Sequence, residues 1–83
     1  MKILYFAWLR ERLNRSEDEF DVPNSVSNVD ELIDWIGEND EAAKMAFENK
    51  KLIRAAVDEK IVEHDYSIAG AKTIAFFPPM TGG

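Results

Sequence analysis

The chain has 83 residues, of which 46% are hydrophobic, and it contains no cysteine. A chain of this length forms one domain around one core, and without cysteine its stability depends on packing rather than on disulfides. Ten basic and sixteen acidic residues give a net charge of −6, which excludes nucleic acid as an expected partner because phosphate backbones require clustered positive charge.

No apolar run reaches the length of a membrane span, and no membrane partner is expected. The first apolar run is followed by Arg10-Glu11-Arg12, where a signal peptide would have small residues for cleavage. Together with the lack of cysteine, which fits a reducing compartment, this predicts a cytoplasmic protein.

The N-terminal segment predicts two paired strands. Residues 3–9 are almost wholly apolar and rich in aromatics, which is typical of a central strand covered on both faces. In residues 17–22, Phe20 and Val22 alternate with acidic residues, which predicts a half-exposed strand that pairs back on the first.

The main helix is expected to begin near Ser27 or Asn28, either of which can cap it. Four apolar residues then follow at helical spacing and predict one buried stripe: Val29, Leu32, Ile33 and Ile36. Gly37 is placed to end this helix in a left-handed conformation. Residues 40–49 predict a second, shorter helix that buries Ala43, Phe47 and either Met45 or Ala46.

Three further strands are expected, over residues 52–57, 60–63 and 73–77, with a glycine-free turn at Asp58-Glu59. Strands at both ends of the chain with a helix between them indicate an α+β fold, a mixed sheet of about five strands crossed by one main helix. A right-handed crossover would place the first and last strands side by side in the middle of the sheet.

Conventional catalytic groups are scarce in this sequence. His64, the single histidine, stands between Glu63 and Asp65 and is interpreted as a solvated loop residue. No ligand spacing indicates a metal site, and none is predicted. The four glycines do not form a phosphate-binding loop.

The C-terminus carries the most specific chemical signal. Gly82 and Gly83 have no side chains, so they neither block a narrow channel nor crowd attack on the terminal carbonyl. Pro78 and Pro79 fix two φ angles and favour an extended exit from the last strand. We expect one domain over residues 1–77 and a flexible tail over 78–83 that reaches about 20 Å.

The run Ala-Phe-Phe-Pro-Pro-Met-Thr-Gly-Gly over residues 75–83 resembles the C-terminal signature of the MoaD family, the small sulfur-carrier subunits of molybdopterin synthase. Residues 3–11, 52–57 and 61–62 also resemble that family, so the likeness covers most of the chain. The resemblance implies a β-grasp, ubiquitin-like fold, which agrees with the order of elements.

The resemblance also implies a function. A MoeB-like enzyme would use ATP to adenylate the Gly83 carboxylate, which would then be converted to a thiocarboxylate. The tail would insert into a MoaE-like large subunit, within a heterotetramer, and donate sulfur to cyclic pyranopterin monophosphate. The chain would not be an enzyme alone and would bind no cofactor permanently. The inserted residues would be Pro78, Pro79, Met80, Thr81, Gly82 and Gly83.

Docking residues are likewise implied by the family. Phe6, Ile61 and Phe77 match positions that contact the large subunit, and simple core packing is the alternative for them. Arg10 matches a position near the activating-enzyme contact, and a solvated surface arginine is its alternative.

Three other functions share some of these features. A ubiquitin-like protein modifier would share the fold, the Gly-Gly end and adenylation, but would join to lysine amines. A ThiS-type carrier for thiazole synthesis would share Gly-Gly but usually lacks the Phe-Phe-Pro-Pro lead. A binding module with an incidental terminus would use none of this chemistry.

Overall fold

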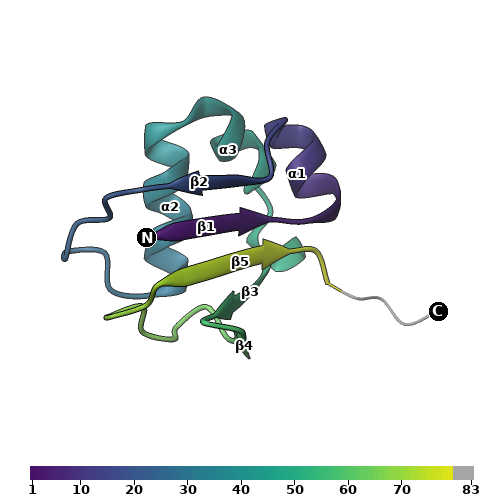
Figure 1. Ribbon diagram of the computed structural model, residues 1–83. Coiled ribbons are helices and arrows are strands. Elements are labelled where there is room, and N and C mark those ends of the chain that lie inside the picture. Colours follow the sequence, from purple (N-terminus) through teal and green to yellow (C-terminus); the bar gives the residue numbers. More distant parts are fainter. Residues whose placement is uncertain (80–83) are drawn as a thin grey trace.

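A mixed five-stranded sheet in the order β2-β1-β5-β3-β4 organises the fold (Figure 1). The computed structural model describes residues 1–79. The strands are β1 (Lys2–Tyr5), β2 (Glu17–Glu19), β3 (Arg54–Val57), β4 (Lys60–Val62) and β5 (Thr73–Phe77). The helices are α1 (Ala7–Leu13), α2 (Val29–Asn39) and α3 (Glu41–Ala46), with a 3₁₀ turn η1 (Lys50–Leu52) before β3.

The first and last strands lie side by side in the middle of the sheet, as predicted. β1 and β5 pair in parallel, with Leu4 opposite Ala75, while β2 and β3 flank them in antiparallel. α2 crosses behind the sheet in Figure 1. Inward side chains of the central pair, Ile3, Tyr5, Ile74 and Phe76, are buried against the helices. The predicted α+β arrangement is therefore confirmed.

α2 begins as the sequence indicates. The Asn28 side chain accepts the Glu31 N–H at 2.8 Å, and the Glu31 carboxylate accepts the Ser27 N–H at 2.8 Å. The first bond satisfies a donor that a helix start leaves free, and the second ties the residue before the cap to the first turn of α2. All four residues of the predicted stripe are buried: Val29, Leu32, Ile33 and Ile36.

The prediction that Gly37 ends this helix is wrong. α2 continues to Asn39, and the extended residue Asp40 separates it from α3. A Cβ at position 37 would lie 3.3 Å from the Lys44 Cα, so this glycine permits close packing of α2 against α3. The predicted second helix is confirmed in shorter form, with Ala46 buried and Met45 exposed.

The prediction of one strand over residues 3–9 is wrong beyond Tyr5. The chain turns at Phe6, and α1 then buries Leu9 and Leu13 at a spacing of one helical turn. Ala7 makes this turn with φ 54°, a left-handed conformation that alanine rarely adopts, so no turn residue marks the boundary in the sequence. The apolar run therefore combines a strand and the start of a helix.

β2, β3 and β4 are shorter than predicted, whereas β5 covers the predicted residues 73–77. β2 ends at Glu19, although Phe20 and Val22 still pack against the core. β3 begins at Arg54 because residues 50–52 form η1. The Asp58-Glu59 turn is confirmed, and both residues have positive φ, 46° and 74°, as a two-residue hairpin turn requires.

Arg15 joins the sheet edge to the junction of α2 and α3. Its Nε donates to Asp18 at 2.6 Å, and its terminal nitrogen donates to Asp40. The Tyr5 hydroxyl donates to the same Asp18 carboxylate at 2.8 Å. Burial, followed by this bond to Asp18, raises the pKa of Tyr5, so the hydroxyl remains a donor.

Among residues 1–79, no helix is both long and apolar enough to cross a membrane.

Asp40→Ala is expected to lower the free energy of unfolding by about 1–2 kcal/mol, because Asp40 caps α3 through the Ala42 and Ala43 N–H groups. Urea unfolding measures this loss. Glu41→Ala is the control, because it changes the neighbouring residue and leaves the Asp40 cap in place. Equal losses in the two variants would contradict the assigned cap.

The Asp40 carboxylate also makes the free energy of unfolding depend on pH. Desolvation acts to raise the pKa of Asp40, but bonds from Ala43, Arg15 and Ala42 outweigh it and leave the pKa lowered. The stabilisation is complete above the ordinary aspartate pKa and disappears as the pH falls through the lower folded-state value. Asp40→Asn should therefore reduce the acid-dependent loss of stability measured by unfolding at several pH values.

Candidate docking surface and tail exit

The face of the sheet opposite the helices carries an apolar patch, here called the open sheet face. It comprises the outward side chains of four strands and the residue after β1: Leu4, Phe6, Ala56, Ile61, Ala75 and Phe77. Alternation along each strand places these residues on one side and the buried core residues on the other. Phe6 is 46% exposed and Ile61 is 60% exposed, so neither serves the core.

The middle of the open sheet face is hollow. A depression of about 610 Å³ is lined by Leu4, Phe6, Ala56 and Ala75, with polar residues at its rim: Asp58, Glu59, Lys72 and Thr73. The two alanines face each other across β3 and β5 and leave room between larger neighbours. Such a concave apolar area with a polar rim is suited to receive an apolar side chain of a partner protein.

The chain leaves the sheet beside this patch. Because β1 and β5 run in parallel, Phe6 and Phe77 reach the same end, where the Phe6 N–H donates to the Phe76 carbonyl at 3.1 Å. Half-buried Pro78 and Pro79 follow Phe77 outside the strand. Met80, Thr81, Gly82 and Gly83, the remaining predicted tail residues, lie outside the described residues.

The structure brings three of the four implied docking residues onto one surface. Phe6, Ile61 and Phe77 share the open sheet face, and the buried aromatic residue of the pair at 76–77 is Phe76. Phe6, Ile61 and Phe77 are not among the buried core residues, so the alternative interpretation of core packing does not apply to them. Arg10 instead lies exposed on α1 and forms no ion pair with any residue from 1 to 79.

Sequence reasoning missed the rest of the surface. Leu4, Ala56 and Ala75 form its centre, and Arg54 lies opposite Phe77 at its edge. Alternation within each strand could have assigned them to a face, but the register that brings them together is a property of the sheet.

His64 is not the solvated loop residue that was expected. It is half-buried, and its Nε2 lies 2.8 Å from the Ile53 carbonyl, which can only accept, so this nitrogen carries the proton. Its own carbonyl accepts the Asp30 N–H at 2.8 Å, which ties the loop after β4 to α2. His64 is thus a structural residue.

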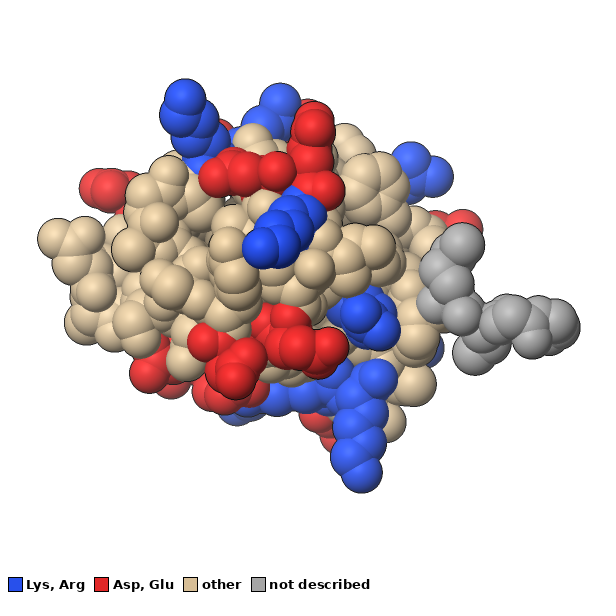
Figure 2. Space-filling model, turned by 90° about the horizontal axis from the view of Figure 1, so that it is seen from below, with Lys and Arg blue, Asp and Glu red and all other residues tan. Residues whose placement is uncertain are grey.

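The described part of the chain contains no group of three or more histidine, cysteine, aspartate or glutamate residues that could hold a metal ion. Acidic and basic side chains stand close together on the face shown in Figure 2, around a broad area of other residues. Among residues 1–79, the exposed apolar surface next to the tail exit is suited to binding a partner protein.

The sheet order, the crossing helix and the exit beside an apolar patch define a small β-grasp, ubiquitin-like protein. Two solved structures support this fold. SAMP1 from Haloferax volcanii superposes with a TM-score of 0.73 at 22% identity, covering 100% of this chain and 98% of that one. A candidate molybdopterin converting factor, subunit 1, from Pyrococcus furiosus gives 0.70 at 24% identity, covering 95% of each chain.

Sequence comparison identifies the family. The model of the ThiS family matches residues 3–83. The molybdopterin synthase sulfur carrier subunit of Escherichia coli (strain K12) is 32% identical over 83 residues, which is 100% of this chain and 99% of that protein. The chain belongs to the ThiS family, and its resemblance to the MoaD proteins is confirmed.

Asp58, at the rim of the hollow, links the turn between β3 and β4 to the start of β5 and so stabilises one side of the open sheet face. Its carboxylate accepts the N–H groups of Lys72 and Thr73 at 3.0 and 2.9 Å, and its φ is positive. Asp58→Ala should lower the free energy of unfolding by about 1–2 kcal/mol, because it removes the one oxygen, Oδ1, that accepts both N–H groups and it strains the turn. Asp58→Asn keeps an acceptor and tolerates this φ, so its urea midpoint should stay near the wild-type value; equal losses would contradict this role.

Proposed function

We propose that this protein is the sulfur carrier subunit of a molybdopterin synthase and that the Gly83 carboxylate is its reacting group. The observation that carries the proposal is the apolar open sheet face, which adjoins the point where the Phe-Phe-Pro-Pro segment leaves the sheet. The 32% identity to the Escherichia coli sulfur carrier subunit over the whole chain supports the same assignment.

Activation would occur in another protein's active site. A carboxylate oxygen of Gly83 attacks the α-phosphorus of ATP, pyrophosphate leaves, and an acyl-adenylate forms. Hydrosulfide or its equivalent then attacks the carbonyl carbon, the bond to AMP breaks, and a thiocarboxylate remains after loss of a proton. No residue among the described ones is required for this chemistry, so the MoeB-like activating enzyme supplies it.

Sulfur transfer would require a second partner. The tail residues from Pro78 to Gly83 enter a MoaE-like large subunit, where the thiocarboxylate sulfur attacks a carbon of cyclic pyranopterin monophosphate; a carbon–sulfur bond forms, one carbon–oxygen bond of the substrate breaks, and the oxygen leaves with a proton or on phosphate. Water then releases the regenerated carboxylate from the pterin sulfur. The catalytic side chains belong to the large subunit, and the working assembly is a heterotetramer in the cytoplasm.

Both partners must accept the same tail, so both must approach the same end of the sheet. Phe6, Ile61 and Phe77 would serve as apolar anchors there, with the hollow between them receiving a side chain of the partner. Arg10 on α1 would contact the activating enzyme from the side.

Intact-mass spectrometry after incubation with ATP, the activating enzyme and a sulfur source tests the proposal. Replacement of one terminal oxygen by sulfur supports a carrier. Conjugates to lysines would instead indicate a protein modifier, and sulfur delivery to a thiazole rather than to a pterin would indicate a ThiS-type role.

Blocking the terminal carboxylate should abolish carrier activity without affecting the fold. Extension beyond Gly83, or deletion of Gly83, leaves every described contact in place but removes the group that is adenylated. Thiocarboxylate formation should fall to background while the urea midpoint is unchanged. An extended protein that supports molybdopterin synthesis without removal of the extension would contradict the proposal.

Phe77→Asp should weaken binding to the large subunit by about tenfold or more, because a charge would replace an apolar anchor at the tail exit. Ile61→Asp should do the same, and it disturbs folding less because Ile61 is 60% exposed. Tyr66→Asp, on a loop outside the patch, is the matched control. Calorimetric titration measures the affinity, and unchanged binding by both patch variants would argue against docking on this face.

A further inference from the structure

A cationic side chain stands at the edge of the open sheet face, next to the tail exit. Arg54 begins β3 and lies opposite Phe77 of β5 in the antiparallel register. Ala55 and Val57 are buried on the helical side, so alternation directs Arg54 and Ala56 to the open sheet face. Arg54 is half-buried there, on a strand that lies between β5 and the edge strand β4.

Arg54 has no ionic partner within the described part of the chain. None of the ion pairs among residues 1–79 includes it. If the register of β3 with β4 continued by one pair, Glu63 would lie opposite Arg54, but β4 ends at Val62 and the two side chains form no ion pair. In the free protein the guanidinium charge is therefore compensated by solvent.

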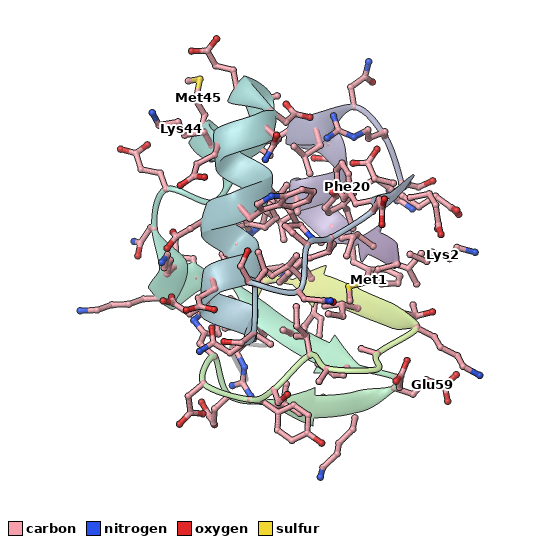
Figure 3. The ribbon with its side chains drawn as sticks, turned by 90° about the vertical axis from the view of Figure 1, so that its left-hand side faces the viewer. Met1, Lys2, Phe20, Lys44, Met45 and Glu59 are labelled. Carbon is pink, nitrogen blue, oxygen red and sulfur yellow. The ribbon has the colours of Figure 1, made fainter. Side chains whose placement is uncertain are left out.

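Other basic side chains at this face are placed differently. Lys2 pairs with Glu17 at 3.5 Å. Lys72 borders the far rim of the hollow together with Glu59. Figure 3, which views the molecule from the end opposite the tail exit, shows Lys2 and Glu59 projecting to the same side of the sheet. Arg54, by contrast, stands at the end of the sheet where the chain leaves β5.

Docking on Phe77 would also remove water from Arg54. Side chains directly opposite each other on antiparallel strands have Cβ atoms about 4.5–5.5 Å apart. A partner surface that covers Phe77 therefore reaches Arg54 as well. Because a guanidinium stays charged at any physiological pH, its desolvation costs binding free energy unless a hydrogen-bonded counter-ion replaces the water. The partner has to supply the acceptor that residues 1–79 do not provide.

We propose that Arg54 binds a carboxylate of the MoaE-like large subunit, at the mouth of the channel that takes up the tail. This inference rests on the proposed function, since it requires docking on Phe77. A carboxylate fits because its two oxygens accept two parallel N–H bonds from the planar guanidinium, which fixes orientation as well as position. Arg54 would thus determine specificity: the apolar anchors supply contact area, and Arg54 selects large subunits with an acidic residue at the matching place.

Calorimetric titration of the large subunit with full-length variants tests this pairing. Arg54→Met keeps an aliphatic stem but removes the charge, and it should weaken binding by about tenfold. Arg54→Lys keeps the charge and should stay within about threefold of the wild type. Arg54→Gln, a neutral hydrogen-bond donor, should bind as weakly as Arg54→Met. The urea midpoints should stay near the wild-type value, because Arg54 forms no ion pair among residues 1–79.

Lys51→Met is the matched control. Lys51 is an exposed cation of η1 outside the open sheet face, and its loss changes the net charge by the same amount. This variant should bind within about twofold of the wild type. An equal loss in Lys51→Met and Arg54→Met would show general attraction between charges rather than a contact of Arg54, and would overturn the inference.

The remaining outcomes are equally decisive. Wild-type affinity in Arg54→Met would exclude the pair, and rescue by Arg54→Gln as complete as by Arg54→Lys would assign an uncharged acceptor. A loss in Glu63→Gln equal to that in Arg54→Met would assign the acceptor to this chain. Slower adenylation of Arg54→Met with unchanged binding to the large subunit would place the carboxylate on the activating enzyme. If the wild type does not bind the large subunit at all, the proposed function itself fails, and the pairing with it.

Discussion

Parallel pairing of β1 with β5 is the constraint on which the rest of the structure depends. The two strands come from opposite ends of the chain, yet their hydrogen bonds place Phe6 and Phe77 at the same end of the sheet. A parallel connection needs a long crossover, and the intervening residues supply it with α2 and α3. The exit of the chain is therefore held by the most central part of the fold rather than by a loose edge.

The same pairing separates the two faces of the sheet chemically. On β5, Ile74 and Phe76 are buried under the helices, while Ala75 and Phe77 face outward. Exposing apolar area costs solubility, but the small alanines limit that area and create a hollow at the same time. The acidic edge strand β2, with Glu17 and Glu19 outward, also discourages unwanted strand pairing at that side of the sheet.

Much of this fold follows from local sequence rules. The cap at Asn28, the stripe along α2 and the strand at 73–77 were all predictable, because each depends on residues close together in the chain. α1 was not, since its start lies inside one apolar run and its turn uses an alanine with positive φ. Gly37 misled for a related reason: its small size serves the contact with Lys44, which only the tertiary structure shows.

The candidate docking surface likewise contains residues that could be predicted and residues that could not. Phe6, Ile61 and Phe77 came from family resemblance, and sequence spacing alone could not have joined residues 6, 61 and 77. Register joins them, and register also brings in Leu4, Ala56 and Ala75.

A carrier with one short tail needs to serve several proteins in turn, and its surfaces have to keep those encounters apart. Any partner that takes up the tail must cover the end of the sheet where Phe6 and Phe77 lie, so successive recipients compete for one face. A protein that acts together with a recipient must bind elsewhere. The helices offer that second side, where Arg10 and Arg12 of α1 form no ion pair with any of residues 1–79. Two chemically different faces on one small domain allow sequential and simultaneous binding to be distinguished by geometry alone.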